Sequence, residues 1–268
     1  MNQSITDKTY KKLAIQVSLN GMSFCVTNTL SNQPEVLQNI HIEHFQKNSN
    51  IENVFETVFN DNPELIQKYD DIVIIHNNNL STFVPTALFD SEFIGSYLQY
   101  STKVFETDFI TFDEINTYQI NNVYIPYVNL NNFFIDKFGT FDYKHSSSIL
   151  VSKLLDLSKN IDEKKMFVHL NSNHFELIVV QNQKLLFYNS FDYKTPEDFI
   201  YYLLFTAEQL QLNPENFKLE LLGAVNQDDK FFQIAFKYVR NTSLFHFEND
   251  FKSLNPHTIR EHFILINS

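Results

Sequence analysis

The fold is decided first by the stretch LAIQVSLNGMSFCVT, which runs from Leu13 to Thr27. Apolar residues alternate with small or polar ones on both sides of Asn20-Gly21. Asn-Gly between two alternating runs is the strongest short signal of a β-hairpin, because these residues suit the tight turns that join such strands. The sequence therefore predicts a strand, a tight turn at Asn20-Gly21 and a second strand.

A second stretch of the same shape, MFVHLNSNHFELIVV, runs from Met166 to Val180. When Gln16 is superposed on His169, apolar residues of the first stretch meet apolar residues of the second. Alternation with a period of two predicts a hairpin here as well. The chain is therefore expected to contain the same opening hairpin twice.

The elements after each hairpin are expected in the same order: a third strand, a helix, a strand, a second helix and a closing apolar strand. They are expected at 36–45, 51–69, 71–76, 91–100 and 123–127 in the first half, and at 184–191, 196–212, 217–223, 229–240 and 263–266 in the second. Pro63 is expected to bend or split the first helix, because proline lacks the amide hydrogen that a helix interior uses.

This order predicts an α/β fold made by tandem duplication of one βββαβα unit. The first unit takes residues 1–128, the second takes residues 165–268, and the segment 129–164 connects them through a helix at 146–157. The alternative is chance, since any two α/β stretches can be matched in this way. No low-complexity linker separates the halves, so they are expected to pack firmly together.

Two tandem units of this order resemble the actin-like ATPase superfamily of actin, sugar kinases and chaperone ATPases. The likeness is greatest to bacterial pilus-assembly and cell-division actin homologues, and residues 166–225 carry most of it. The segments 121–127 and 139–145 resemble an uncharacterised bacterial family with a reduced, degenerate form of this fold. The resemblance implies two ribonuclease-H-like halves around a cleft. It also implies no lid subdomains, because two minimal units use nearly all of the 268 residues.

The resemblance also shows which nucleotide-site residues have changed. In the superfamily the first strand of each half ends in an Asp that serves magnesium, followed two positions later by a Gly that lets backbone amides approach the phosphates. Here Gln16 and His169 stand at the Asp positions, and Ser18 and Asn171 stand at the Gly positions. Gln lacks the charge and neutral His is a poor magnesium ligand. ATP and magnesium are therefore disfavoured, and no catalytic residue is predicted.

Two further parts of the resemblance are incomplete. The adenosine motif of the superfamily, a strand ending in two glycines, becomes Leu221-Leu222-Gly223-Ala224, with one glycine left. The region that orients the attacking water becomes Tyr143 to Ser148. His145 in this region could act as a base, but a helix-capping or surface role is the preferred interpretation.

Composition excludes other classes of protein. The net charge is -12, and only Arg240 and Arg260 supply a guanidinium, so nucleic acid is not expected as a partner. The longest apolar run, Phe199 to Phe205, is far shorter than a membrane-spanning helix, and the first residues lack a signal core. The single cysteine, Cys25, is expected to be a buried strand residue rather than a nucleophile. A soluble, cytoplasmic protein is expected.

Three other groups of polar residues could be ligand sites, but for each of them a structural role is preferred. The stretch His41-Ile-Glu43-His44 could place two zinc ligands on one face, but an exposed edge strand is preferred. His169 and His174 flank the second turn, and a polar turn is preferred to a transition-metal site. Asn77-Asn78-Asn79 follows a strand, where α/β proteins often bind ligands, but a solvated loop is preferred. No metal site is predicted.

The preferred function is a non-catalytic actin-like module that binds or scaffolds partner proteins, on a sheet edge or in the cleft. The first alternative is a nucleotide- or small-molecule-binding protein, and the second is a weak ATPase that uses His145 or His169. An acid that reaches the cleft, such as Asp70 or Asp142, would favour a ligand site. The predicted cleft residues are Gln16, Ser18, Asn20, Gly21, His169, Asn171, Ser172, Asn173 and Gly223.

Overall fold

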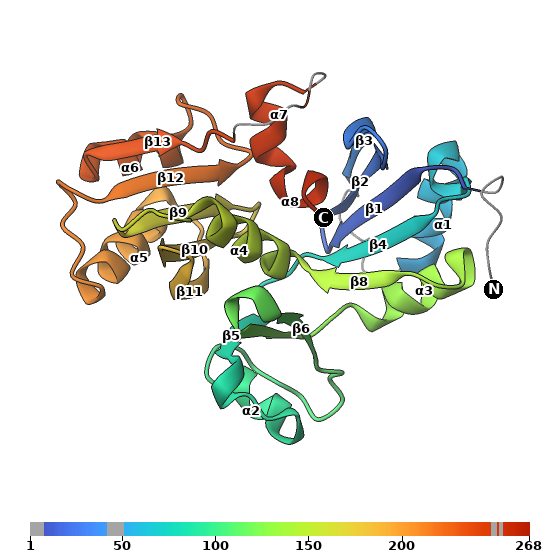
Figure 1. Cartoon of the computed structure of the whole chain (residues 1–268), viewed down its shortest axis with the longest axis horizontal. Coiled ribbons are helices and arrows are strands. Elements are labelled where there is room, and N and C mark those ends of the chain that lie inside the picture. Colours follow the sequence, from blue (N-terminus) through green and yellow to red (C-terminus); the bar gives the residue numbers. More distant parts are fainter. Residues whose placement is uncertain (1–7, 42–50, 248–250, 252–253) are drawn as a thin grey trace.

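The computed structural model describes residues 8–41, 51–247, 251 and 254–268, and it contains two five-stranded sheets side by side (Figure 1). The first sheet has β1 (Lys11–Ser18), β2 (Gly21–Asn28), β3 (Gln33–His41), β4 (Asp71–His76) and β8 (Asp142–His145), in the order β3-β2-β1-β4-β8. The second has β9 (Lys165–Leu170), β10 (His174–Gln181), β11 (Lys184–Asp192), β12 (Lys218–Gly223) and β13 (Asn241–Leu244), in the order β11-β10-β9-β12-β13.

The two sheets share one topology. In each, the central strand pairs antiparallel with the hairpin strand and parallel with the strand that follows the first helix. The registers also agree: Val17 pairs with Met22 in the first sheet, and Leu170 pairs with Phe175 in the second. The predicted α/β fold of two repeated units is confirmed, and Gln16 and His169 occupy matching positions in it.

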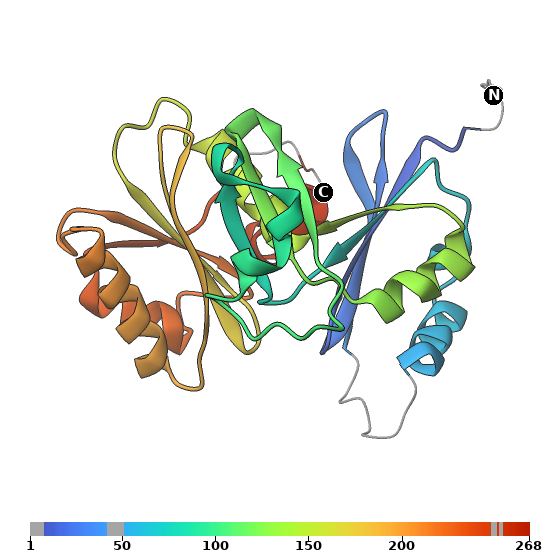
Figure 2. The ribbon, with the colours of Figure 1, turned by 90° about the horizontal axis from the view of Figure 1, so that it is seen from below.

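Helices cover the outer face of each sheet and fill the space between the sheets (Figure 2). Pro63 splits the first predicted helix, since α1 stops at Asp61 and a 3₁₀ turn, Pro63–Ile66, follows. Thr195 and Asp198 form a capping box at the start of α5, where Pro196 occupies the first turn. The outer helices are α1 (Ile51–Asp61) and α3 (Val128–Phe138) on the first sheet and α5 (Pro196–Gln209) and α6 (Lys230–Tyr238) on the second, and α4 (Ser146–Leu157) and α8 (Phe263–Ile266) lie between.

Neither predicted closing strand completes its five-stranded sheet. The strands that complete the two sheets are β8 and β13, which pair parallel with β4 and β12. The segment 263–266 is the helix α8, which packs against β1, β2 and α4, so Phe263, Ile264 and Leu265 are all buried. A short run that is buried on every side is apolar throughout and shows no period. The pattern therefore does not distinguish a helix from a strand.

The segment 123–127 overlaps a small third sheet that the sequence pattern did not predict. This sheet has β5 (Ser81–Pro85), β7 (Ile120–Tyr124) and β6 (Thr111–Ile115), in that order, and it is inserted in the first half between β4 and α3. The helix predicted at 91–100 is only α2 (Ile94–Leu98) after a 3₁₀ turn, and it packs against β5 and β7. The inserted sheet lies at one edge of the molecule, between the halves (Figure 1).

Two further predicted segments can be compared with the structure: the connecting segment and the third strand of the first half. The predicted connecting segment 129–164 contributes α3 and α4, as well as β8, which belongs to the first sheet. The last residues of the predicted third strand, 42–45, lie outside the described residues. One apolar core joins the halves, because α4 and α8 bury Leu150, Leu154 and Phe263 against residues of both sheets.

Candidate functional site

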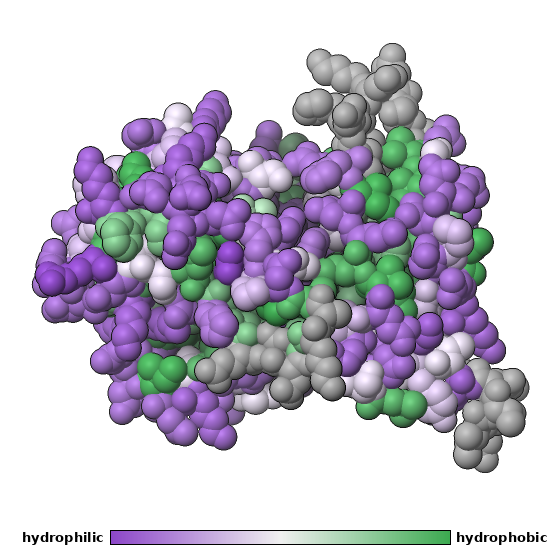
Figure 3. Space-filling view, turned by 90° about the horizontal axis from the view of Figure 1, so that it is seen from above, coloured by the Kyte–Doolittle hydropathy of each residue, from purple (hydrophilic) through white to green (hydrophobic). Residues whose placement is uncertain are grey.

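A cavity of about 310 Å³, hereafter the cleft cavity, lies between the two halves. Figure 3 shows the surface hollowed between the halves, with mostly hydrophilic residues around it. The structure brings eight of the nine predicted residues to this cavity, and Asn173 lines a neighbouring cavity of about 130 Å³. The predicted residues in the cleft cavity are Gln16, Ser18, Asn20, Gly21, His169, Asn171, Ser172 and Gly223.

The first turn differs from the predicted one. Ser18 pairs with Gly21, so the two-residue loop is Leu19-Asn20, and Gly21 begins β2. The Ser18 hydroxyl donates to the Gly21 carbonyl at 3.2 Å, and the Asn20 amide donates to the Ser18 hydroxyl at 3.3 Å. A Cβ on Gly21 would lie 2.7 Å from the Ile40 carbonyl oxygen. The glycine is therefore explained by its close approach to β3, and the turn is closed by its own hydrogen bonds.

The glycine that remains of the adenosine motif also has a packing role. Gly223 has a φ of +94°, which favours glycine, and it pairs with Leu170 on β9. A Cβ at this position would lie 2.3 Å from the Leu170 carbonyl oxygen. No side chain fits there, with or without a nucleotide.

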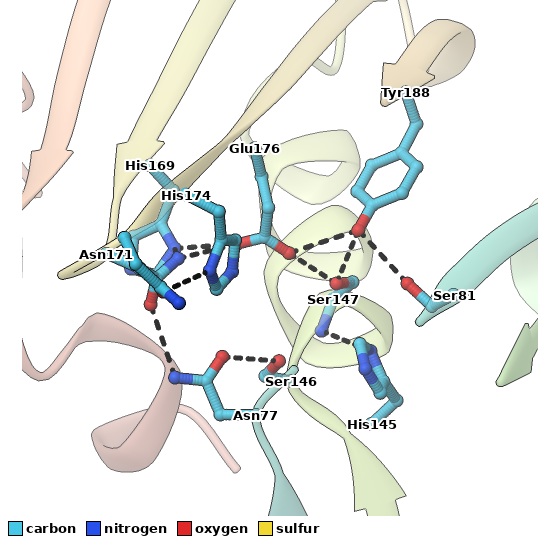
Figure 4. A network of polar contacts seen from close by, with 11 residues as sticks. Asn77, Ser81, His145, Ser146, Ser147, His169, Asn171, His174, Glu176 and Tyr188 are labelled. Atoms are coloured by element: carbon cyan, nitrogen blue, oxygen red, sulfur yellow. Dashed lines mark hydrogen bonds and ion pairs between the residues drawn. The ribbon is translucent and has the colours of Figure 1, made fainter. Parts of the chain in front are cut away.

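Beside the second turn lies a buried carboxylate that the sequence pattern did not predict (Figure 4). Glu176 on β10 is 1% exposed, and its Oε2 lies 2.7 Å from Nδ1 of His169 on β9. The Ser147 hydroxyl donates to Oε1 of Glu176, and the Tyr188 hydroxyl donates to the same oxygen at 3.1 Å. Burial by itself would raise the pKa of Glu176, but the hydrogen bonds from His169 and Ser147 lower that pKa to about 2. The carboxylate is therefore ionised.

The Glu176 network reaches the inserted sheet. The Tyr188 hydroxyl lies 2.7 Å from the Ser147 hydroxyl and 3.1 Å from the Ser81 hydroxyl on β5. Phe83 on the same strand packs edge-on against the Tyr188 ring. A continuous chain of polar contacts therefore runs from the second turn, through the start of α4, to the inserted sheet.

The asparagines after β4 join the two halves. The Asn77 side-chain amide donates to Oδ1 of Asn171 at 3.2 Å, and the Ser146 hydroxyl donates to Oδ1 of Asn77 at 3.1 Å (Figure 4). The Asn79 amide donates to the Asp192 carboxylate at 2.9 Å. The preferred interpretation of this segment as a solvated loop is wrong, because the side chains bridge the halves beside the cleft cavity.

His145 is a buried helix cap. Its Nδ1 accepts from the Ser147 amide at the start of α4 at 3.1 Å, and its Nε2 lies 3.2 Å from Oδ1 of Asn78. Burial lowers the pKa of His145 to about 3, so the ring is neutral, with Nε2 donating to Asn78. The capping role is confirmed and the surface role is wrong. Both ring nitrogens are engaged in the fold, which leaves neither one free to act as a base.

The charged residues of the cleft cavity are acidic. Asp229, just before α6, and Glu261, at the end of α7 (Pro256–Glu261), line it, and no lysine or arginine among the described residues does. Asp70 instead accepts hydrogen bonds from the amides of Thr9 and Tyr10. Asp142 is an exposed residue at the start of β8. The acids that reach the cleft are thus different from those the sequence suggested.

No cluster of three or more His, Cys, Asp or Glu side chains in the described part of the chain could hold a metal ion. His41 lines the cleft cavity, whereas Glu43 and His44 lie outside the described residues. Cys25 is buried in β2, with its Sγ 3.5 Å from the Thr27 hydroxyl. Within the described residues, no helix has the length and apolar character needed to cross a membrane.

Solved structures with this fold include a Bacteroides thetaiotaomicron protein with an actin-like ATPase fold and unknown function, at a TM-score of 0.80 and 19% identity, covering 91% of this chain and 93% of that one. A PilM–PilN type IV pilus biogenesis complex matches at a TM-score of 0.56 and 9% identity, covering 95% and 96%. The ethanolamine utilization protein EutJ from Carboxydothermus hydrogenoformans matches at 0.51 and 7%, covering 96% and 90%. The chain therefore has the actin-like ATPase fold.

Sequence comparison with curated proteins finds no match. A family model does match, over residues 1–242, which is most of the chain. The chain belongs to the family described as protein of unknown function, DUF3822.

Proposed function

We propose that this chain is a non-catalytic actin-like protein that binds a partner protein and acts as a scaffold in the cytoplasm. The observation that carries the proposal is the chemistry of the two turns beside the cleft. Gln16 and His169 replace the magnesium-binding acids, and the first turn is closed by its own Ser18 hydrogen bonds. Without those acids, the fold has no evident means of holding a metal–triphosphate.

The charges of the cleft cavity support the same proposal. A nucleotide triphosphate needs cations or free backbone amides around its phosphates. The described lining instead supplies two carboxylates, Asp229 and Glu261, together with amides, hydroxyls and imidazoles. Repulsion between these acids and phosphate disfavours ATP as a cofactor.

The surviving glycines give no support to a nucleotide site. Gly21 and Gly223 both approach a neighbouring backbone carbonyl too closely for any Cβ. Packing of the sheets explains both residues, so neither is evidence for a phosphate or an adenosine.

A structural neighbour suggests the kind of function. PilM has been solved in complex with its partner PilN in type IV pilus biogenesis. In the present chain, β3 is an edge strand of the first sheet, and its residues Asn39 and His41 also line the cleft cavity. An extended segment of a partner could add to this edge by main-chain hydrogen bonds and place side chains in the cleft.

The test has two parts. Calorimetry and thermal unfolding with ATP, GTP and magnesium are expected to show no binding and no change in Tm, and phosphate release is expected to equal that of a buffer blank. Capture from native lysate is then expected to return one reproducible partner, whose purified form binds with the same Kd with or without ATP. Magnesium-dependent stabilisation by ATP would overturn the non-catalytic assignment, and failure to obtain a partner that binds in purified form would overturn the scaffold.

Small-molecule binding is the second candidate function, because the cleft cavity of about 310 Å³ reaches the lower end of the range for ligand sites. Nucleotides are the less suitable ligands, for the reasons of charge given above. A weak ATPase would have to depend on His169, since both nitrogens of His145 are already bonded.

A further inference from the structure

The two carboxylates of the cleft cavity have no cationic protein partner in the described lining. One oxygen of Asp229 accepts the Phe231 amide at 2.9 Å and so caps α6. Its other oxygen receives no hydrogen bond from the described residues. Among the described residues, the basic groups within 4.0 Å of the Glu261 carboxylate are His257, at 3.6 Å, and His262, at 4.0 Å. The wall of the cavity formed by α6 and α7 is therefore negatively charged.

His169 presents a hydrogen-bond acceptor to the same cavity. Its side chain is nine-tenths or more buried, and its Nδ1 is held by the ionised Glu176 carboxylate at 2.7 Å. An ionised carboxylate can only accept, so Nδ1 carries the proton of this contact, and Nε2 is the nitrogen that the contact leaves over. Among the described residues, none donates to that nitrogen, although His169 lines the cavity. The pairing with Glu176 thus holds the ring of His169 in the wall of the cleft cavity and leaves Nε2 for a ligand.

His174, which lines the smaller neighbouring cavity, supplies a second acceptor. The ring is 6% exposed, its Nδ1 lies 3.0 Å from Oδ1 of Asn173, and its Nε2 is buried without a partner among the described residues. Burial lowers the pKa of His174, which keeps the ring neutral and Nε2 an acceptor. His174 lines the smaller cavity, which shares Asn77, Asn171 and other lining residues with the cleft cavity.

We propose that the cleft cavity binds an organic cation rich in N–H donors, an alkylammonium or guanidinium group, which pairs with Asp229 and Glu261 and donates to Nε2 of His169. Such a group matches both features of the lining: the negative charge and the imidazole nitrogen of His169 to which no described residue donates. Anions are repelled by the carboxylates, and a neutral polyol leaves their charge unpaired. The inference goes beyond the proposed function, because it concerns ligand chemistry and stands whether or not a partner protein exists.

Two sources can supply this chemistry: a free amine, or an Arg or Lys side chain. Agmatine is the probe for the first and the peptide acetyl-Gly-Arg-Gly-amide for the second, each titrated into the purified chain by calorimetry. At an ionic strength of about 0.01 M, where screening acts only beyond about 30 Å, at least one of them is expected to bind. Tetramethylammonium, which has the charge but no N–H donor, is expected to bind several-fold more weakly because it cannot donate to His169.

The variants Asp229→Asn and Glu261→Gln are each expected to lower the affinity about five- to tenfold, as for partly exposed charge-assisted contacts. Asparagine still caps a helix, so Asp229→Asn keeps α6 intact. Glu208→Gln on α5 is the matched control, because it removes one exposed negative charge that does not line the cavity. Its affinity is expected to equal that of the wild type.

Binding of agmatine that both cleft variants weaken would support a free amine as the ligand. Binding of the peptide alone, weakened in the same way, would support a side chain of a partner. The proposal is overturned if neither probe binds at millimolar concentration, if the cleft variants bind as the Glu208→Gln control does, or if tetramethylammonium binds as tightly as the probes. None of these outcomes depends on whether a partner is captured from lysate.

Discussion

Oε2 of Glu176 lies 2.7 Å from Nδ1 of His169, across the antiparallel pair β9–β10 in which the two residues face one another. The matching pair in the first half is Gln16 and Ser23, which also face one another on β1 and β2. Both pairs belong to the same position of the repeated unit, yet only the second half carries a charge there. The two halves therefore share a backbone arrangement but differ in the charge at this position.

Replacing Glu176 by Gln is expected to lower the free energy of unfolding by about 2–4 kcal/mol, because an ionised acceptor of three hydrogen bonds becomes a neutral amide that cannot accept all of them. Urea unfolding at pH 7 measures the change. Glu208→Gln, exposed on α5, serves as control and is expected to change stability by less than about 0.5 kcal/mol. Equal stability of the two variants would show that the Glu176 network does not stabilise the fold.

The stabilising effect of Glu176 should depend on pH, which the wild type and the Glu176→Gln variant can show. The pKa of Glu176 is about 2 in the folded chain against an ordinary value of 4.5, so its stabilising effect is complete above pH 4.5 and is lost as the pH falls toward 2. The stability difference between wild type and Glu176→Gln is expected to shrink by about 3 kcal/mol over that range. Urea unfolding at successive pH values follows the difference, and a constant difference would contradict the prediction.

Two buried histidines should make the fold sensitive to mild acid. Burial lowers the pKa of His76 to about 4 and that of His145 to about 3, from an ordinary 6.5. Unfolding lets each ring take up a proton, so their stabilising effect is complete above pH 6.5 and declines below it. Each contributes a slope of up to about 1.4 kcal/mol per pH unit. His145→Gln, which keeps an amide donor and acceptor, is expected to reduce the slope between pH 6 and pH 4.5, as measured by urea midpoints at each pH. An unchanged slope would refute the assignment.

Gly223→Ala is expected to lower the free energy of unfolding by about 2–4 kcal/mol, because the new Cβ meets the Leu170 carbonyl oxygen in a left-handed backbone conformation. Gly139→Ala is the matched control. Gly139 also has a positive φ, of +76°, but its Cβ would meet nothing within 4 Å, so the cost should be only about 1 kcal/mol. Thermal or urea unfolding without any ligand measures both. If Gly223 served a nucleotide alone, the two variants would be equally stable.

Much of the fold follows from local patterns. Alternation of apolar residues in the stretches 13–27 and 166–180 predicts both hairpins, although the first turn lies one residue earlier than the predicted Asn20-Gly21. The run Asp71–His76, mostly β-branched, predicts β4. Thr195-Pro196 places the start of α5, since capping and the first turn of a helix depend on residues adjacent in the chain. These features were predicted because period and capping are properties of neighbouring residues.

Other elements could not be predicted in this way. The run 263–266 is a helix because it is buried between β1, β2 and α4, and the segment 123–127 was assigned to the first sheet, although β7 belongs to the inserted one. Burial on all sides removes the polar positions that would reveal a period. The choice between helix and strand then depends on neighbours that are distant in sequence.

The sequence by itself determined the repeated hairpin and the polar residues at its two turns, because each of these depends on positions a few residues apart. Only the tertiary structure decided that Glu176 holds His169, that Asn77 joins the halves through Asn171, and that Asp229 and Glu261 supply the charge of the cavity. These contacts join residues on different strands, helices and halves. A side chain's partner in space is set by how the sheets and helices pack, and no local pattern encodes that.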